Sequence, residues 1–159
     1  ITYAEGPWQF KFGYYHLSSH LGDEFMLLNP DVKRINYTRD AILFGTAYYL
    51  TPSLRIYGEV AYSFRVSDGA KPWEFQFGFD YAPPGPTGLA GAPFIASNVH
   101  LREEVDFGGN FVFQAGWAWR GDSTRLLRVG VQYYNGKSPQ FEFFNQFEEQ
   151  FGIGIWFDY

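Results

Sequence analysis

A histidine and a serine two residues apart, His16 and Ser18, have the clearest capacity for chemistry in this sequence. In serine hydrolases a histidine takes the proton of a serine hydroxyl, which attacks an ester carbonyl, and an acidic side chain orients the histidine. Every second residue over 8–14 is aromatic, and His16 and Ser18 continue the same alternation. In an extended strand these two side chains therefore share a face with the aromatic rings.

The acidic partner must come from another segment. If the first two predicted strands form a hairpin with residue 8 near residue 50, Ser18 lies opposite Asp40, whose alternation with apolar neighbours places it on the same face. We therefore predict Ser18 as nucleophile, His16 as base and Asp40 as the orienting acid. Glu24 and Asp23, in the following loop, are rivals for the third role.

A plainer interpretation stays open for the same residues. His-x-Ser is short enough to arise by chance, and polar side chains are common where a membrane strand reaches the interface. His16, Ser18 and His20 would then form a collar that contacts lipid headgroups.

The elements that position these residues are predicted to be β-strands. Alternation of apolar and polar residues dominates the chain, helix signals are nearly absent, and no run of 18 apolar residues occurs. The predicted strands are 7–20, 36–50, 54–66, 72–82, 93–103, 109–120, 124–135 and 148–159.

The face of the strands that points inward can be predicted from the small interior volume of a narrow barrel. A soluble barrel such as a lipocalin turns apolar residues inward, and a membrane barrel does the reverse. The interior of an eight-stranded barrel is too narrow for consecutive aromatic rings, and glycines such as Gly116 and Gly130 fall on the polar face. The prediction is one all-β domain over 1–159, an antiparallel up-and-down transmembrane β-barrel of about eight strands with a packed polar lumen. The domain is either the whole barrel or the C-terminal part of a longer one.

Composition limits the partners. Aromatic residues make up 22% of the chain, and the net charge is −5, which disfavours nucleic acid. Cysteine is absent, so no thiolate metal site is expected, and no cofactor is predicted. Acidic loop residues are weak Ca²⁺ candidates, with solvated loop charges as the alternative. They are Asp23, Glu24, Glu103, Glu104 and Asp106.

The loop 136–148 contains four phenylalanines among acidic residues. It is predicted either to contact a protein partner or the membrane interface, or to lie over the mouth of the barrel. The expected main partners are membrane lipids.

Two resemblances add to these predictions. His16 and Ser18 on an outer barrel wall resemble the site of outer-membrane phospholipase A and lipid A 3-O-deacylase, which implies a phospholipid or lipopolysaccharide substrate. The segments 12–24, 98–109 and 132–159 resemble a family of uncharacterised bacterial outer-membrane β-barrel proteins. This second resemblance implies the barrel and the outer membrane, but no activity.

The expected function is thus an integral outer-membrane barrel with a structural, anchoring or assembly role. The alternative is a lipid-ester hydrolase that uses Ser18, His16 and Asp40. A small-solute pore is the weakest alternative, because eight strands leave little room for water.

Overall fold

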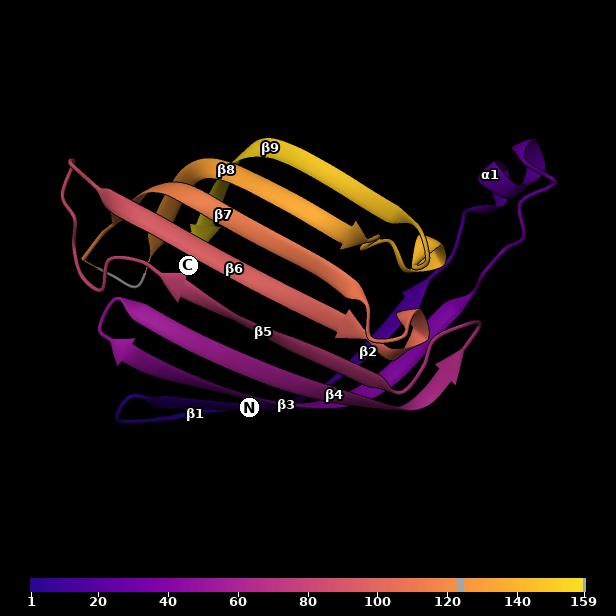
Figure 1. Cartoon of the computed structure of the whole chain (residues 1–159), viewed down its shortest axis with the longest axis horizontal. Helices are drawn as coiled ribbons and strands as arrows, with labels where there is room; N and C mark the ends of the chain where they lie inside the picture. The colour runs from indigo at the N-terminus through magenta and orange to yellow at the C-terminus, as the bar shows by residue number, and fades with distance from the viewer. Residues whose placement is uncertain (123–124, 159) are drawn as a thin grey trace.

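The computed structural model describes residues 1–122 and 125–158. Within them the chain forms one antiparallel sheet of nine strands, each paired with the next along the sequence (Figure 1). The strands are β1 Thr2–Glu5, β2 Trp8–Ser19, β3 Tyr37–Thr51, β4 Leu54–Ser67, β5 Trp73–Tyr81, β6 Ala92–Arg102, β7 Gly109–Arg120, β8 Leu126–Lys137 and β9 Phe147–Asp158.

The eight predicted strands are confirmed with small shifts at their ends, and β1 is the one that the pattern missed. Four residues are too few to show alternation, and β1 turns back into β2 through Gly6, whose φ of +55° suits glycine. A short helix, α1 Asp23–Leu28, stands in the predicted loop between β2 and β3. Residues 124 and 159, the predicted ends of two strands, lie outside the described part.

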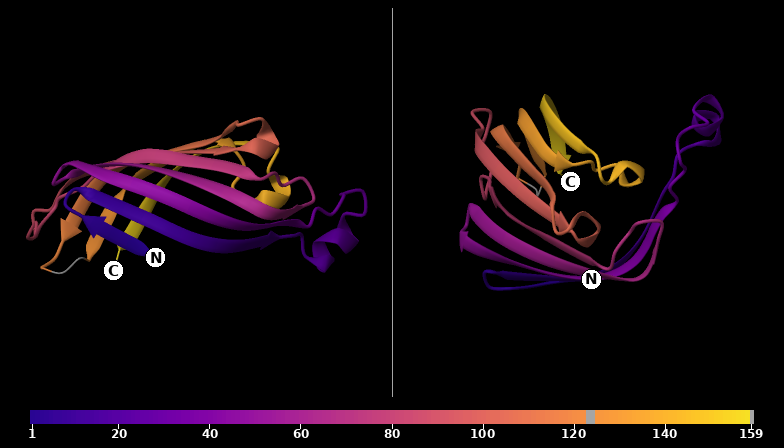
Figure 2. Two further views of the ribbon diagram at one scale, coloured as in Figure 1. Left: turned by 90° about the horizontal axis from the view of Figure 1, so that it is seen from below. Right: turned by 45° about the vertical axis from the view of Figure 1, so that its right-hand side comes forward.

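The sheet is strongly curled, with β1 and β9 at its two rims (Figure 2). Side chains of strands that are not neighbours meet across the concave face: Tyr15 of β2 donates a hydrogen bond to Glu74 of β5. The polar face is therefore the inner one, as predicted. The convex face carries exposed apolar side chains such as Phe12 and Phe77.

In the described residues the sheet does not close into a barrel. The short strand β1 occupies the edge of β2 beside residues 8–11, so β9 cannot pair there. The exposed edge is visible in the side chains: Ile153 of β9 is 84% exposed, whereas its cross-strand partner Val131 is 36% exposed. The predicted all-β, antiparallel up-and-down architecture is confirmed, and in the described residues it is a curled sheet of nine strands that is not closed.

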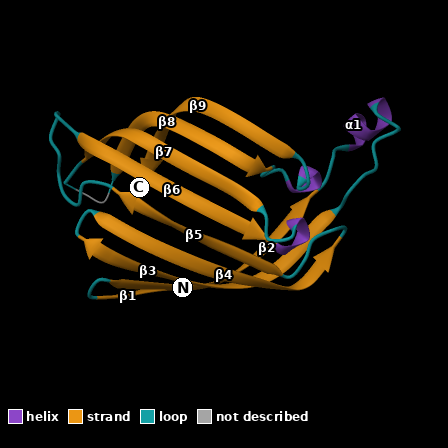
Figure 3. Cartoon of the chain, viewed as in Figure 1, coloured by secondary structure: helices purple, strands orange, loops and turns teal. Residues whose placement is uncertain are grey.

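The helical turns of the described residues lie at one end of the sheet (Figure 3). The described helices are all too short to span a bilayer. At the opposite end, the long connection before β6 folds back onto the convex face. There Trp117 and Trp119 donate indole hydrogen bonds to the carbonyls of Ala90 and Leu89.

The loop between β8 and β9 turns inward over the concave face. Phe141 lies with its ring centroid 5.0 Å from that of Tyr37, and Arg102 donates a hydrogen bond to the carbonyl of Ser138. Ser19 of β2 donates a hydrogen bond to Glu142, which ties the loop to the far side of the sheet. Of the predictions for this loop, the structure matches the one in which it covers the mouth.

The inward glycines allow close strand approach. Gly116 and Gly130 stand opposite each other on β7 and β8. A methyl group on either would lie 2.2 Å from a carbonyl oxygen of the neighbouring strand, and on Gly116 it would also meet the ring of the buried Phe94.

Candidate functional site

The predicted site lies on the convex face, where β2, β3 and β4 lie side by side. Their register places outward residues in rows across the three strands. The rows change from apolar to polar toward the α1 end. In order, they are Phe12, Phe44 and Val60; Tyr14, Ile42 and Tyr62; His16, Asp40 and Arg65; and Ser18, Thr38 and Ser67.

His16 and Asp40 form the centre of the site. The imidazole Nδ1 of His16 lies 2.8 Å from Asp40 Oδ1, and the phenol of Tyr14 donates a 2.6 Å hydrogen bond to the same oxygen. The His16 side chain is 56% exposed and that of Asp40 only 10%. An imidazole that donates from Nδ1 to a carboxylate carries its lone pair on Nε2, so the outer nitrogen is available as a base.

The predicted register is wrong by two residues. Asp40 stands opposite His16, and Ser18 stands opposite Thr38. Residue 8 pairs with residue 48 and not with residue 50, so every predicted partner on β3 is displaced by two positions and keeps its face. The observed register places the carboxylate on the histidine, which is where a serine hydrolase needs it.

Ser18 follows His16 on the same face of β2, but the two are not joined. Between these described side chains there is no hydrogen bond. Alternate residues of a strand are about 7 Å apart at their Cα atoms, so contact needs a rotation of both side chains toward each other. The structure therefore brings together the predicted base, His16, and the predicted acid, Asp40, but not the predicted nucleophile, Ser18.

The rival acids do not reach the histidine. Asp23 forms an ion pair with Arg34, whose hydrogen bond and charge hold the pKa of this exposed carboxyl below its ordinary value. Glu24 lies in α1, beyond the end of β2. No hydrogen bond in the described residues links either carboxylate to His16.

The acidic loop residues also have roles other than metal binding. Glu103 accepts a hydrogen bond from the backbone of Trp73, and Glu104 accepts one from Tyr37. Asp106 adopts a left-handed conformation that ends the turn before β7. In the described part of the chain, no three acidic, histidine or cysteine side chains are grouped as a metal site would require.

A second polar cluster, on the concave face, was not predicted as a unit. Arg39, 1% exposed, forms ion pairs with Glu74 and Glu104, and His100 Nε2 lies 3.1 Å from Glu74. Phe141 of the inward loop covers the cluster and borders a cavity of about 210 Å³ beside it. The sequence indicates this cluster only through charged residues at inward positions of successive strands. Arg39 of β3, Glu74 of β5 and Glu104 of the turn after β6 meet because the sheet is curled.

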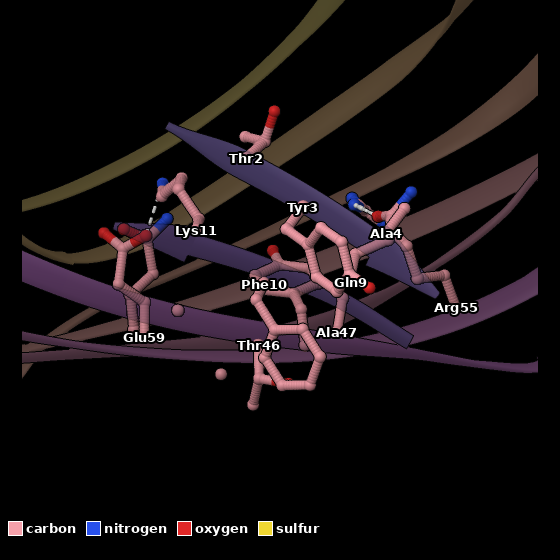
Figure 4. Close-up of a pocket in the computed structure, with 14 residues that line it drawn as sticks. Thr2, Tyr3, Ala4, Gln9, Phe10, Lys11, Thr46, Ala47, Arg55 and Glu59 are labelled. Carbon is pink, nitrogen blue, oxygen red and sulfur yellow. Dashed lines mark hydrogen bonds and ion pairs between the residues drawn. The ribbon is translucent and has the colours of Figure 1, made fainter. Parts of the chain in front are cut away.

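A cavity of about 570 Å³ lies on the concave face beside β1 (Figure 4). Its charged side chains are paired: Lys11 with Glu59, and Arg55 with Asp80. No serine or histidine lines it, so it holds no pair of the kind predicted at His16 and Ser18.

Comparison with known proteins gives one result. A family model, described as "Protein of unknown function (DUF1207)", matches residues 2–159. No curated protein and no solved structure matches the chain. Since the family model covers almost the whole sequence, the chain belongs to the DUF1207 family.

Proposed function

We propose that this chain forms the wall of a β-barrel in a bacterial outer membrane, with a structural or anchoring role. The observation that carries the proposal is the sidedness of the sheet. Apolar side chains cover the convex face and remain exposed, while charged residues pair on the concave face. Outward apolar and inward polar residues are the arrangement of a membrane barrel and the reverse of a soluble one.

A depth-dependent pair of substitutions tests this placement. Phe77 lies in the middle of β5, and Trp73 is the first residue of the same strand; both are exposed on the convex face. In a bilayer, Phe77→Arg should cost about 2–4 kcal/mol and Trp73→Arg about 0–1 kcal/mol.

The measurement is unfolding by urea after insertion into phospholipid vesicles, with vesicle flotation to show that the protein is bound. Equal small costs at both positions, or protein that stays at the bottom of the gradient, would refute the membrane placement.

A second function, hydrolysis of a lipid ester, is favoured by the 2.8 Å contact between His16 Nδ1 and Asp40. In the proposed reaction, Ser18 Oγ attacks the ester carbonyl while its proton passes to His16 Nε2. The proton is then given to the leaving alcohol, and an acyl group remains on Ser18. Water, deprotonated by His16, releases the fatty acid and restores the serine. Asp40 holds the imidazole in the tautomer that this requires.

The depth of these three residues on the convex face supports a membrane lipid as the substrate. His16, Asp40 and Ser18 lie where the convex face changes from apolar to polar, which in the proposed placement is the depth of lipid esters. Phospholipid and lipopolysaccharide are therefore the substrates to assay.

Fatty-acid release by detergent-solubilised protein tests the hydrolase. Ser18→Ala should lower kcat by about 10⁶-fold and Asp40→Asn by about 10⁴-fold. Ser67→Ala, in the same outward row as Ser18 but two strands away, is the matched control and should keep full activity. Equal release by wild type and Ser18→Ala would refute the hydrolase and leave the structural role in place.

A further inference from the structure

An arginine is turned onto the convex face beside His16 and Asp40 by an irregularity in β4. Asp40 pairs with Arg65, while the next residue of β3, Ala41, pairs with Ser63, so Phe64 is an extra residue on β4. Regular alternation from the buried Ser63 would turn Arg65 inward. The β-bulge reverses this, because one extra residue changes the face on which the following side chains lie.

The guanidinium of Arg65 is left with unused donors. Its side chain is 80% exposed, and its Nη1 lies 3.8 Å from Asp40 Oδ2, an ion-pair distance too long for a hydrogen bond. No hydrogen bond joins Arg65 to another described residue. Asp40 thus attracts the guanidinium electrostatically, while most of the Arg65 side chain stays exposed.

Apolar rings lie next to this arginine. Phe64, the extra residue of the bulge, stacks on Tyr14 with ring centroids 6.3 Å apart. Both rings are exposed on the convex face, toward the apolar rows. A ligand that contacts both features must therefore be anionic at one end and apolar at the other.

We propose that Arg65 binds the phosphodiester of a membrane lipid, with Phe64 and Tyr14 against its acyl chains. An arginine fork matches two phosphate oxygens, and such charge-assisted bonds are among the strong ones. This inference rests on the proposed membrane placement, but it does not depend on hydrolysis.

The carboxylate of Asp40 narrows the choice of anion. It lies close enough to repel whatever Arg65 binds, and the repulsion is about twice as large for a dianion as for a monoanion. A lipid phosphodiester carries one negative charge, whereas inorganic phosphate carries more than one near neutral pH and gains nothing from the two rings. The site therefore selects the lipid over the free ion.

Binding in a nonionic detergent tests the proposal. Native mass spectrometry would count bound phosphatidylglycerol, diacylglycerol of the same acyl chains, and inorganic phosphate. Wild type should prefer phosphatidylglycerol over diacylglycerol. Arg65→Gln should weaken phosphatidylglycerol binding about tenfold, and Arg65→Lys should restore part of it.

Lys33→Gln is the control, because it removes the same charge from an exposed loop at the same end of the sheet. It should leave binding within about twofold, the range of an exposed charge. Thermal unfolding of each variant shows that the fold is intact.

Unchanged phosphatidylglycerol binding in Arg65→Gln would overturn the inference, as would equal binding of diacylglycerol. Inorganic phosphate that displaces the lipid at equal concentration would assign the site to a free anion and also overturn it. Vesicle flotation reports separately on the membrane placement. A protein that floats but shows no effect of Arg65→Gln refutes the lipid site alone.

Discussion

Replacing Glu74 by glutamine should destabilise this protein strongly, because Glu74 belongs to a buried cluster of ion pairs. Glu74 is 6% exposed and forms an ion pair with Arg39, which is 1% exposed. It also accepts a hydrogen bond from Tyr15 and contacts His100. After Glu74→Gln, the guanidinium of Arg39 retains only Glu104 as a carboxylate partner.

The loss of stability expected for Glu74→Gln follows from the burial of Arg39. Removing one partner of a buried ion pair costs about 3–5 kcal/mol, because the remaining charge stays desolvated. That loss lowers the ratio of folded to unfolded protein by about 10²- to 10⁴-fold. Glu59→Gln is the matched control, since Glu59 pairs with a lysine whose side chain is 50% exposed. A pair of that kind is worth about 0–1 kcal/mol.

Urea unfolding in detergent micelles, followed by tryptophan fluorescence, measures both costs. The two variants should differ in unfolding midpoint with the same dependence on urea. If Glu74→Gln loses no more than Glu59→Gln, the concave cluster is not a desolvated ion-pair network and the reasoning fails.

Two further predictions concern close packing. Gly130→Ala should lower the thermal midpoint and the free energy of unfolding, the latter by about 1–3 kcal/mol, because the added methyl group would lie 2.2 Å from a backbone oxygen. Gly152→Ala is the control: its methyl group would meet nothing within 4 Å, so the free energy of unfolding should change by no more than about 0.5 kcal/mol. A loss in both, or in neither, would contradict this account of the inward glycines. Phe141→Ala should speed amide hydrogen exchange in the loop 138–146, because the ring no longer packs on the concave cluster. Phe147→Ala, at an exposed position of β9, is the control, and equal exchange in both would show that Phe141 does not hold the loop.

The strands and their faces could be predicted from the sequence because alternation is a local property. Apolar and polar residues at every second position determine which side chains share a face, whatever the partner strand is. This sufficed to place His16, Ser18 and Asp40 on one face. It also sufficed to turn the inward glycines toward the concave side.

The pairing across strands was decided only by the tertiary structure. The pairing of β2 with β3 differs by two residues from the predicted one, and the bulge at Phe64 shifts the pairing of β3 with β4. Neither leaves a mark on the alternation of a single strand. Asp40 consequently meets His16 and not Ser18, and Arg65 lies outside and not inside.

Whether the sheet closes, and which inward side chains meet across it, is likewise decided by the tertiary structure. β1 pairs with residues 8–11 of β2 and forms one rim of the described sheet, β9 forms the other rim, and the two rims do not pair. Arg39 and Glu74 meet because the sheet curls enough for β3 and β5 to face each other across its concave side. Alternation in the sequence determines the face on which each side chain lies. Which side chains meet is determined by the twist of the sheet, its bulges and the pairing of its edges, because these three features depend on contacts between residues far apart in the chain.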